Sequence, residues 1–311
     1  MTLLLDVRSP EWMTDEQLKS ELLAIDSNLD IVCAAENFDP EKVSMLATSL
    51  YQHGSWKNYP NLKVIQKIGA GVDSILKDET IPEDIQVTRI RSEVPAKEIA
   101  QFCLTYVLAD LRNVRVHFED QSKGIWNQIG PKPYQNAKVA VLGLGTIGRL
   151  TAELFVRNEF EVMGWSRTPK QIPGVQCLAG DENLETVLAQ CNYICAILPS
   201  TPETRGLMAT ELFSKFNPDG VLINAGRGDL VVEDDLIKAI DNGMLRGAVL
   251  DVMNQEPLPE NSPLWSHPGI VLTPHVSGWH LGDAISNIST NYRALESGQP
   301  LINRIDRKLG Y

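Results

Sequence analysis

The chain has 311 residues, of which 43% are hydrophobic and 22% charged, as in an ordinary globular protein long enough for two domains with cores of their own. The formal net charge of −12 argues against nucleic acid or an anionic membrane surface as a partner. An anionic substrate would therefore have to be held by locally placed cations. No stretch reaches the roughly 18 apolar residues of a membrane span.

The N-terminal residues MTLLLDVRSP lack a basic segment and a cleavage site, so we expect no secretory signal. The five cysteines form an odd set with neither a CxxC pair nor the Cys/His spacing of a metal site: Cys33, Cys103, Cys177, Cys191 and Cys195. We therefore expect reduced, mostly buried thiols in a cytoplasmic protein, and no bound metal.

Residues 1 to 95 alternate short apolar strands with helical patches, which predicts a small open α/β sheet. The expected elements are strands over 3–7, 31–34, 64–68 and 86–90, with a helix over 14–25. The sequence Gly69-Ala70-Gly71 follows one strand directly and so lies at the carboxyl edge, where open sheets bind ligands. Its backbone N–H groups could bind an anion, although a plain strand-to-helix turn has the same sequence character.

Apolar residues keep helical spacing from 96 to 118, over a length greater than that of most single-domain helices. We expect this long helix to cross between two domains. The segment 124–133, which contains Trp126, then leads to an apolar strand over 138–142.

That strand leads directly into a glycine motif and then into a helix, with a second strand over 161–165. In a dinucleotide site the first glycine permits the turn, the second lets the backbone approach a pyrophosphate, and the third allows the helix to pack on the strand. The phosphates bind the helix N-terminus. The candidate residues are Gly143, Gly145, Thr146, Ile147 and Gly148. A glycine-rich turn that binds nothing is the alternative.

The end of the second strand favours NADP(H), with NAD(H) still possible. An NAD site usually has Asp or Glu about 20 residues past the motif, whereas here Ser166 stands 18 residues after Gly148. It is followed by Arg167 and Thr168, and the two hydroxyls and the guanidinium of these three residues are donors suited to a 2′-phosphate. The alternative is a solvated basic turn. We also count Trp165, which precedes these residues, as a candidate cofactor contact.

Near-continuous apolar runs over 193–198, 221–224, 248–251 and 270–273 indicate parallel strands covered on both faces. Helices are expected over 233–242 and 281–297, the latter folding back onto the first domain. The predicted fold is α/β with two domains. Residues 100–275 form a Rossmann-type doubly wound parallel sheet, and residues 1–95 with 280–311 form a smaller flavodoxin-like substrate domain. We expect two crossover segments to act as a hinge that closes over the cofactor.

Three polar residues that suit hydride transfer to a 2-oxo acid follow the last three of these strands: Arg227, Glu256 and His275. Arg227 can hold a carboxylate through two bonds and polarise the ketone. His275 can protonate the ketone oxygen, and Glu256 would orient the imidazole and favour its charged form. Taken singly, Arg227 could be a surface cation, Glu256 a loop carboxylate and His275 a buried structural histidine.

The chain resembles the D-isomer-specific 2-hydroxyacid dehydrogenases over essentially its whole length. The resemblance rests on GAGVD, GLGTIG, LPSTPETRGLM, NAGRGDLV, LDVMNQEPLP and TPHVSG. Within that family it is most similar to the glyoxylate/hydroxypyruvate reductase A subgroup. This second resemblance rests on WSRTPKQIPGVQ, VVEDDL, EPLPENSPLW and the terminal residues Arg-Lys-Leu-Gly-Tyr.

The resemblance implies roles for further residues. Arg227, Glu256 and His275 match the catalytic residues of the family, and Ala70 and Gly71 match backbone donors to the substrate carboxylate. Cofactor contacts are implied at Leu198, Pro199 and Thr204 in a loop over the cofactor, and at Ala225 and Asp251 beside the nicotinamide carboxamide. We count Gly278 with them. The family forms homodimers through the cofactor domain, so we expect a homodimer here.

Two departures from the family pattern concern Ala100-Gln101, where the family has Ala-Glu, and Ser277-Gly278-Trp279-His280. We expect Trp279 to contact the substrate and limit its length, with packing between domains as the alternative. The expected reaction is reduction of a small, singly charged 2-oxo acid, glyoxylate or hydroxypyruvate, to the D-2-hydroxy acid.

Two further functions stay open. Phosphoglycerate dehydrogenase, or another D-2-hydroxyacid dehydrogenase, is the enzymatic alternative, although a phosphorylated substrate would need additional cations. A dinucleotide-sensing corepressor is the non-enzymatic alternative. Such proteins need partner-binding extensions, which we do not expect here.

Overall fold

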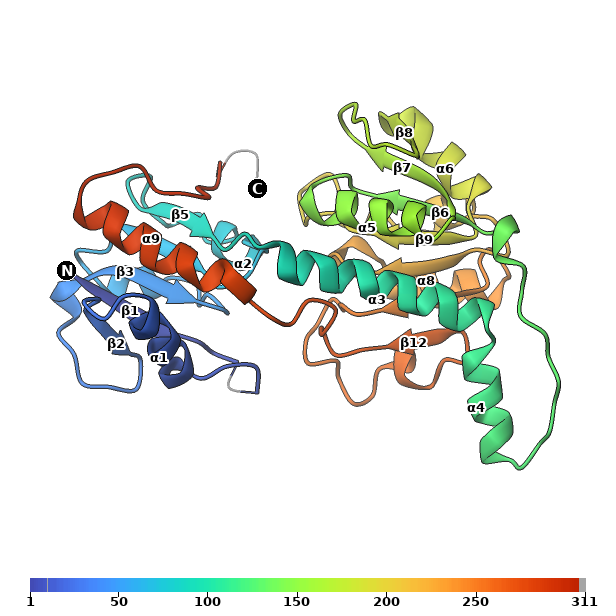
Figure 1. Ribbon diagram of the computed structural model, residues 1–311, viewed down its shortest axis with the longest axis horizontal. Helices are drawn as coiled ribbons and strands as arrows, with labels where there is room; N and C mark the ends of the chain where they lie inside the picture. The colour runs from blue at the N-terminus through green and yellow to red at the C-terminus, as the bar shows by residue number, and fades with distance from the viewer. Residues whose placement is uncertain (10, 308–311) are drawn as a thin grey trace. The chain divides into compact units, whose positions relative to one another are not determined.

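The computed structural model describes residues 1–9 and 11–307, so Lys308 to Tyr311 of the terminal motif lie outside the described residues. The chain divides into two compact units. The first, here called the N-terminal unit, contains Met1–Val94 together with the chain from Trp279 onward. The second, here called the central unit, contains Pro95–Gly278. Figure 1 shows the helices and strands of both.

The N-terminal unit contains a five-stranded parallel sheet in the order β2-β1-β3-β4-β5. This is the flavodoxin-like strand order, which confirms that part of the predicted fold class. The strands are β1 (Thr2–Asp6), β2 (Ile31–Cys33), β3 (Val43–Thr48), β4 (Val64–Lys67) and β5 (Gln86–Arg89).

The central strand β3 was not predicted from the sequence. All six of its residues are buried, because it lies at the centre of the sheet between β1 and β4 and both faces of the sheet are covered. Burial on both faces removes the alternation that marks a half-exposed strand. The small or polar side chains of Ser44, Ala47 and Thr48 weaken the apolar signal further.

Helices cover both faces of this sheet. On one face α1 (Asp15–Ile25) packs with α9 (Ile285–Glu296), so the helix expected near the C-terminal end belongs to this unit. The capping box at Thr14 satisfies N–H groups at the start of α1. The other face is covered by the short helix α2 (Asp73–Leu76) and neighbouring loops. Three 3₁₀ turns complete the unit: η1 (Pro40–Lys42), η2 (Ser55–Asn58) and η7 (Gly282–Ala284).

The central unit contains a seven-stranded parallel sheet in the order β12-β11-β10-β9-β6-β7-β8. Counted from β6, this is the Rossmann order with one extra strand, which confirms the predicted Rossmann-type doubly wound sheet. The edge strand β8 was not expected, because its sequence VQCLA is short and partly exposed. The strands are β6 (Lys138–Leu142), β7 (Glu161–Ser166), β8 (Val175–Ala179), β9 (Tyr193–Ala196), β10 (Val221–Asn224), β11 (Gly247–Leu250) and β12 (Ile270–Leu272).

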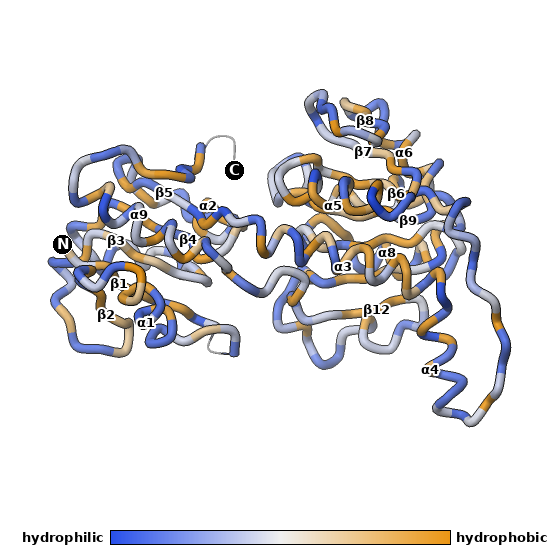
Figure 2. Tube along the Cα trace, in the orientation of Figure 1, coloured by the Kyte–Doolittle hydropathy of each residue, from blue (hydrophilic) through white to orange (hydrophobic). Residues whose placement is uncertain are grey.

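Two apolar layers enclose this sheet, and Figure 2 shows the hydrophobic residues concentrated along its strands. One layer is formed by α3 (Glu93–Leu111) and α5 (Thr146–Arg157). The other is formed by α6 (Leu184–Gln190), α7 (Thr210–Phe213) and α8 (Glu233–Asp241). The remaining 3₁₀ turns are η3 (Tyr134–Asn136), η4 (Asp181–Asn183), η5 (Gly228–Leu230) and η6 (Pro263–Ser266).

The prediction of a single long helix over 96–118 is wrong. The structure has α3 ending at Leu111 and a separate helix α4 (Val114–Ser122). Asn113 breaks the helical path because its φ of 53° lies in the left-handed region, and its side chain donates to the carbonyl of Gly130 at 2.8 Å. The apolar spacing continues across the break, so the sequence pattern alone does not reveal it.

The cysteines carry no disulfide: Cys33, Cys103, Cys191 and Cys195 are buried thiols, and Cys177 is half-buried. Within residues 1–9 and 11–307, no helix has the length and apolar character needed to cross a membrane.

Candidate active site

The glycine motif at the carboxyl end of β6 has the geometry of a phosphate-binding turn. Gly143 has a φ of 96°, which favours glycine. A Cβ on Gly148 would stand 1.7 Å from the carbonyl oxygen of Gly143, so only glycine lets α5 pack this closely. A Cβ on Gly145 would meet nothing within 4 Å. Gly145 and Thr146 are exposed at the start of α5, so the residues present fit a dinucleotide pyrophosphate.

The end of β7 adjoins this turn, because the N–H of Gly143 donates to the carbonyl of Trp165 at 2.8 Å. Trp165 and Ser166 use their polar groups within the protein. The indole of Trp165 donates to Gly180 O at 2.8 Å, and the hydroxyl of Ser166 donates to Thr168 O at 2.8 Å. The side chains exposed here are those of Arg167 and Thr168.

The charge of Arg167 affects the pKa of a carboxyl group in the loop that follows β9. The pKa of Glu203 is lowered mainly by a hydrogen bond from Thr201, with its own backbone N–H and the Arg167 charge as further causes. The same loop contains Leu198, which is buried, and Pro199, whose carbonyl accepts from the Thr204 hydroxyl at 2.6 Å.

Arg227 stands in a loop that Asn224 shapes. The buried side chain of Asn224 accepts from the N–H of Gly226 at 3.1 Å and donates to Arg227 O at 2.9 Å. The Arg227 guanidinium donates to Gly226 O at 2.6 Å. Ala225, in the same loop, is buried. The role of Asn224 was missed because a buried Asn as the last residue of a strand gives no distinctive sequence signal.

Gly228 brings the Arg227 loop against the loop after β11. A Cβ on Gly228 would stand 1.9 Å from the carbonyl oxygen of Met253, so the two backbones touch only because this residue is glycine. The N–H of Met253 in turn donates to Oε1 of Glu256 at 3.0 Å. This contact places the carboxylate of Glu256 near Arg227.

Glu256 and His275 form a direct pair, with His275 Nδ1 at 2.7 Å from Glu256 Oε2. Burial opposes ionisation of Glu256. However, the hydrogen bond and charge of His275, the Met253 N–H and the Arg227 charge outweigh burial and hold the pKa of Glu256 below its usual value. The His275 side chain is 53% exposed, so its ring is accessible while Nδ1 is engaged.

Asp251 fixes the backbone that carries His275. Its carboxylate is fully buried and accepts the Thr273 hydroxyl at 2.6 Å and the N–H groups of Val276 and Ser277 at 2.9 Å each. The Asp251 carbonyl accepts the N–H of His275 at 2.8 Å, where the chain has a φ of 56°. Both carboxylate oxygens therefore have protein donors, a role that the sequence did not reveal.

Gly278 packs closely against the N-terminal part of α3. A Cβ at this position would stand 3.1 Å from the side chain of Ile99 and 3.2 Å from Pro95 O. Gly278 therefore allows close approach between the segment after His275 and the helix.

The remaining candidates belong to the N-terminal unit. Ala70 is exposed and Gly71 half-buried in the turn after β4. Trp279 is 37% exposed, and its carbonyl accepts the indole N–H of Trp12 at 2.7 Å. Trp12 is thus a neighbour of the candidate substrate residue Trp279, and the sequence did not reveal this neighbour.

Within the central unit, the structure gathers the predicted residues at one edge of the sheet. The glycine motif, Arg167, Arg227, Glu256 and His275 all follow the carboxyl ends of parallel strands. Among the described residues, no three His, Cys, Asp or Glu side chains are arranged to hold a metal ion.

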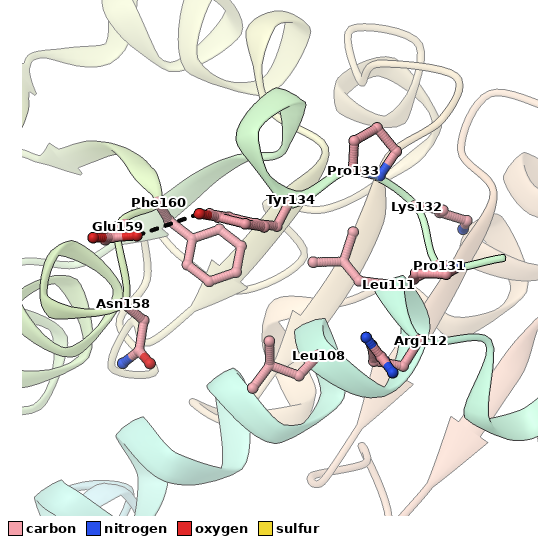
Figure 3. A pocket seen from close by; sticks show the side chains of 10 residues that line it. All are labelled: Leu108, Leu111, Arg112, Pro131, Lys132, Pro133, Tyr134, Asn158, Glu159 and Phe160. Atoms are coloured by element: carbon pink, nitrogen blue, oxygen red, sulfur yellow. Dashed lines mark hydrogen bonds between the residues drawn. The ribbon is translucent and has the colours of Figure 1, made fainter.

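A hollow of about 420 Å³ in the central unit lies away from this edge (Figure 3). It is lined by the end of α3, by residues 131–134 and by Asn158–Phe160, which precede β6 and β7. It therefore adjoins the amino ends of these strands and is separate from the candidate active site.

Comparison with known proteins finds a matching family model and relatives that cover most of the chain. Residues 104–277 match the family model of the D-isomer specific 2-hydroxyacid dehydrogenase, NAD binding domain. Glyoxylate/hydroxypyruvate reductase A of Serratia proteamaculans (strain 568) is 37% identical over 265 residues, which cover 83% of this chain and 85% of that relative.

Two solved structures extend the similarity over the full length. A D-isomer specific 2-hydroxyacid dehydrogenase from Xanthobacter autotrophicus Py2, in complex with NADPH and MES, is 35% identical with a TM-score of 0.91, covering 100% of this chain and 99% of that one. The NADPH-dependent glyoxylate/hydroxypyruvate reductase of Sinorhizobium meliloti, in complex with NADP and sulfate, is 27% identical with a TM-score of 0.89 and the same coverage. The chain therefore belongs to the D-isomer-specific 2-hydroxyacid dehydrogenase family and is an NAD(P)-dependent oxidoreductase.

Proposed function

We propose that this protein catalyses the NADPH-dependent reduction of a small 2-oxo acid, glyoxylate or hydroxypyruvate, to the D-2-hydroxy acid. The observation that carries the proposal is the 2.7 Å pair of His275 and Glu256, on the same sheet edge as Arg227 and the glycine motif. The family assignment and the reductases named above support the choice of reaction.

In the proposed reaction the reduced nicotinamide, when bound, supplies a hydride to the carbonyl carbon of the substrate. His275 gives a proton to the carbonyl oxygen, which is a general-acid contribution of roughly 10² to 10⁴ in rate. Glu256 remains ionised because its pKa is lowered, so it holds Nδ1 and stabilises the imidazolium. Arg227 binds the substrate carboxylate and polarises the ketone.

We assign the cofactor to the carboxyl edge of the central sheet. The open space over Gly145 and the exposed start of α5 suit the pyrophosphate. We infer that Leu198, Pro199 and Thr204 lie over the cofactor, and that Ala225, Asp251 and Gly278 lie beside the nicotinamide. Because the Asp251 carboxylate is already bonded, its main contribution in this proposal is to hold the segment 273–277 in place.

The preference for NADPH over NADH is assigned to Arg167 and Thr168. Both are exposed beside the glycine turn, and no acidic residue stands at the end of β7 to repel a 2′-phosphate. Arg can grip such a phosphate through two parallel hydrogen bonds. The relatives solved with NADPH or NADP support this assignment.

For the N-terminal unit, we propose that the backbone N–H groups of Ala70 and Gly71 bind the substrate carboxylate. Trp279 is proposed to limit the length of the substrate side chain. These two features favour a small oxo acid carrying a single negative charge.

We also infer a homodimer formed through the central unit. Several large apolar side chains are exposed on the end of α3, on α4 and on the segment that follows, and Figure 2 shows where α3 and α4 lie. They are Leu108, Val116, Phe118, Ile125, Trp126, Ile129 and Tyr134. Trp126 is 90% exposed and Phe118 66%. Exposed large apolar side chains concentrated in one segment favour an interaction site, and a second copy of the chain is the partner that the family resemblance implies.

Sedimentation velocity tests the homodimer. We expect the wild type to sediment as a dimer and the double variant Phe118→Asp/Trp126→Asp as a monomer. Trp265→Asp is the control, since this exposed residue lies elsewhere in the same unit. A monomeric wild type would exclude the homodimer.

The activity is tested by NADPH oxidation with a panel of oxo acids: glyoxylate, hydroxypyruvate, phenylpyruvate and 3-phosphohydroxypyruvate. We expect the highest kcat/KM with glyoxylate or hydroxypyruvate, and D-glycerate as the product from hydroxypyruvate. A strong preference for 3-phosphohydroxypyruvate would identify a phosphoglycerate dehydrogenase instead.

A further inference from the structure

Two cations stand side by side at the carboxyl edge of the N-terminal sheet. Lys67 ends β4 and Arg89 ends β5, and the two residues are register partners on neighbouring parallel strands. Like charges directly opposite each other normally destabilise a sheet. Their placement therefore calls for interactions that offset the repulsion.

Both cations donate to carbonyl groups at the ends of strands. Lys67 Nζ donates to the carbonyls of Ser49 and Ile68, the latter at 3.1 Å. Arg89 Nη1 donates to the carbonyl of Ala70 at 3.2 Å. Lys67 Nζ also lies 3.4 Å from the position that a Cβ on Gly69 would occupy. The positive charge is therefore directly beneath the turn Gly69-Ala70-Gly71.

Because the peptide group is planar, the direction of each of these bonded carbonyl groups also fixes the direction of the N–H group in the same peptide. In a trans peptide the C=O and the N–H point in opposite directions. The bond from Lys67 to Ile68 O therefore turns the N–H of Gly69 away from the cation, and the bond from Arg89 to Ala70 O does the same for Gly71. In the part of the chain that the structure describes, the N–H groups of Gly69, Ala70 and Gly71 donate to no protein acceptor.

We propose that Lys67 and Arg89 are positioning residues for the carboxylate-binding turn, a role that rests on the proposed function. They fix outward-facing N–H groups, and their charge favours a bound carboxylate. The protein has a net charge of −12, so an anionic substrate depends on such local cations. Arg227 holds a carboxylate by direct contact, whereas Lys67 and Arg89 act through the backbone.

Lys67 also connects two strand ends, which suggests a structural role that the experiment has to separate from the proposed one. Ser49, whose carbonyl accepts from Lys67, follows β3, and the Ser49 hydroxyl accepts the N–H of Arg8 at 3.2 Å. Loss of Lys67 could therefore loosen this edge for any substrate. A comparison of charged and uncharged substrates distinguishes the two roles.

The test is the variant Lys67→Met, which keeps the apolar stem and removes the charge. Its kinetics are measured with glyoxylate and with the uncharged methyl ester of glyoxylate, at saturating NADPH. Lys63→Met is the matched control, because Lys63 is exposed and precedes the opposite end of the same strand. Lys67→Arg tests rescue by a second cation. Binding of oxamate, measured by calorimetry in the presence of NADPH, gives a readout that does not depend on turnover.

We expect Lys67→Met to raise the KM for glyoxylate and the dissociation constant of oxamate about tenfold, the equivalent of one charge-assisted contact. The values of kcat, the KM for the ester and the KM for NADPH should change less than about twofold. Lys67→Arg should restore part of the loss, and Lys63→Met should resemble the wild type. Equal losses with acid and ester, or unchanged oxamate binding, would overturn the proposal. A wild type that binds oxamate and NADPH but reduces no oxo acid would instead refute the proposed function.

Discussion

The imidazole of His275 is held by Glu256 at 2.7 Å, while the backbone N–H of His275 donates to the carbonyl of Asp251 at 2.8 Å. The side chain and the backbone of the proposed acid are therefore both fixed by the segment that follows β11. Such preorganisation lets the proton be delivered without reorientation of the ring.

Replacing His275 with Ala should lower kcat roughly 10² to 10⁴-fold while NADPH still binds. Glu256→Gln should have an effect that depends on pH. The pKa of Glu256 lies below its usual value, so the carboxylate is charged at neutral pH and favours imidazolium. Without that charge, activity should decline at a lower pH than in the wild type, so the deficit should grow as the pH rises. A pH profile of kcat/KM that is only scaled down would contradict the pairing.

Replacing Arg167 with Ala should raise the KM for NADPH by roughly 10- to 150-fold, since a hydrogen bond to a charged group contributes about 1.5 to 3 kcal/mol. The KM for NADH should change little, because NADH lacks the 2′-phosphate. Arg157→Ala is the control, since this exposed cation lies in the last turn of α5, away from the glycine motif. Equal losses with both cofactors would show that Arg167 has another role.

Much of the candidate site could be predicted because its residues follow strands whose apolar runs are visible in the sequence. Gly143, Arg227 and His275 are examples, and parallel strands bring such residues to one edge. The positions of the supporting residues could not be predicted. Asn224 and Asp251 act through hydrogen bonds to backbone groups of their own or neighbouring loops, which are set only by the tertiary fold.

The errors in the fold have similar physical causes. Strand β3 is buried on both faces and contains small polar side chains, so neither alternation nor a strong apolar run marks it. The break between α3 and α4 depends on the φ of one residue, Asn113, within an otherwise helical pattern. The glycine turn after β4 was recognised, but Lys67 and Arg89 beneath it became visible only from the pairing of β4 with β5.

A second pH-dependent prediction concerns the stability of the central unit. Asp110 accepts two bonds from Arg246 at 2.7 Å each and the hydroxyl of Tyr193 at 2.6 Å. Burial opposes ionisation of Asp110, but these bonds and the charges of Arg246 and Lys132 outweigh it and lower the pKa to about 2 from its ordinary value of 3.8. A carboxyl group whose pKa is lowered by folding stabilises the folded protein at any pH above its pKa in the unfolded state. This stabilisation is lost as the pH falls through the pKa of the group in the folded state.

Asp110→Asn should therefore lower the free energy of unfolding by about 2 kcal/mol at neutral pH, since one pKa unit corresponds to about 1.4 kcal/mol. The difference from the wild type should shrink as the pH falls from about 4 to about 2. Urea denaturation at several pH values measures it. Asp84→Asn, at an exposed position, is the control and should change stability little. A constant difference at all pH values would mean that ionisation of Asp110 does not contribute.

The last prediction concerns substrate size and Trp279. This side chain is 37% exposed, and the bond from Trp12 to its carbonyl holds the backbone in place. If Trp279 limits the length of the substrate, Trp279→Ala should raise the ratio of kcat/KM for phenylpyruvate to that for glyoxylate by about tenfold, the equivalent of about 1.4 kcal/mol. Trp265→Ala removes another exposed indole, in η6, and should leave the ratio unchanged. An unchanged ratio in Trp279→Ala, together with a lower unfolding temperature, would assign Trp279 to packing, and the size limit would then have to come from other residues.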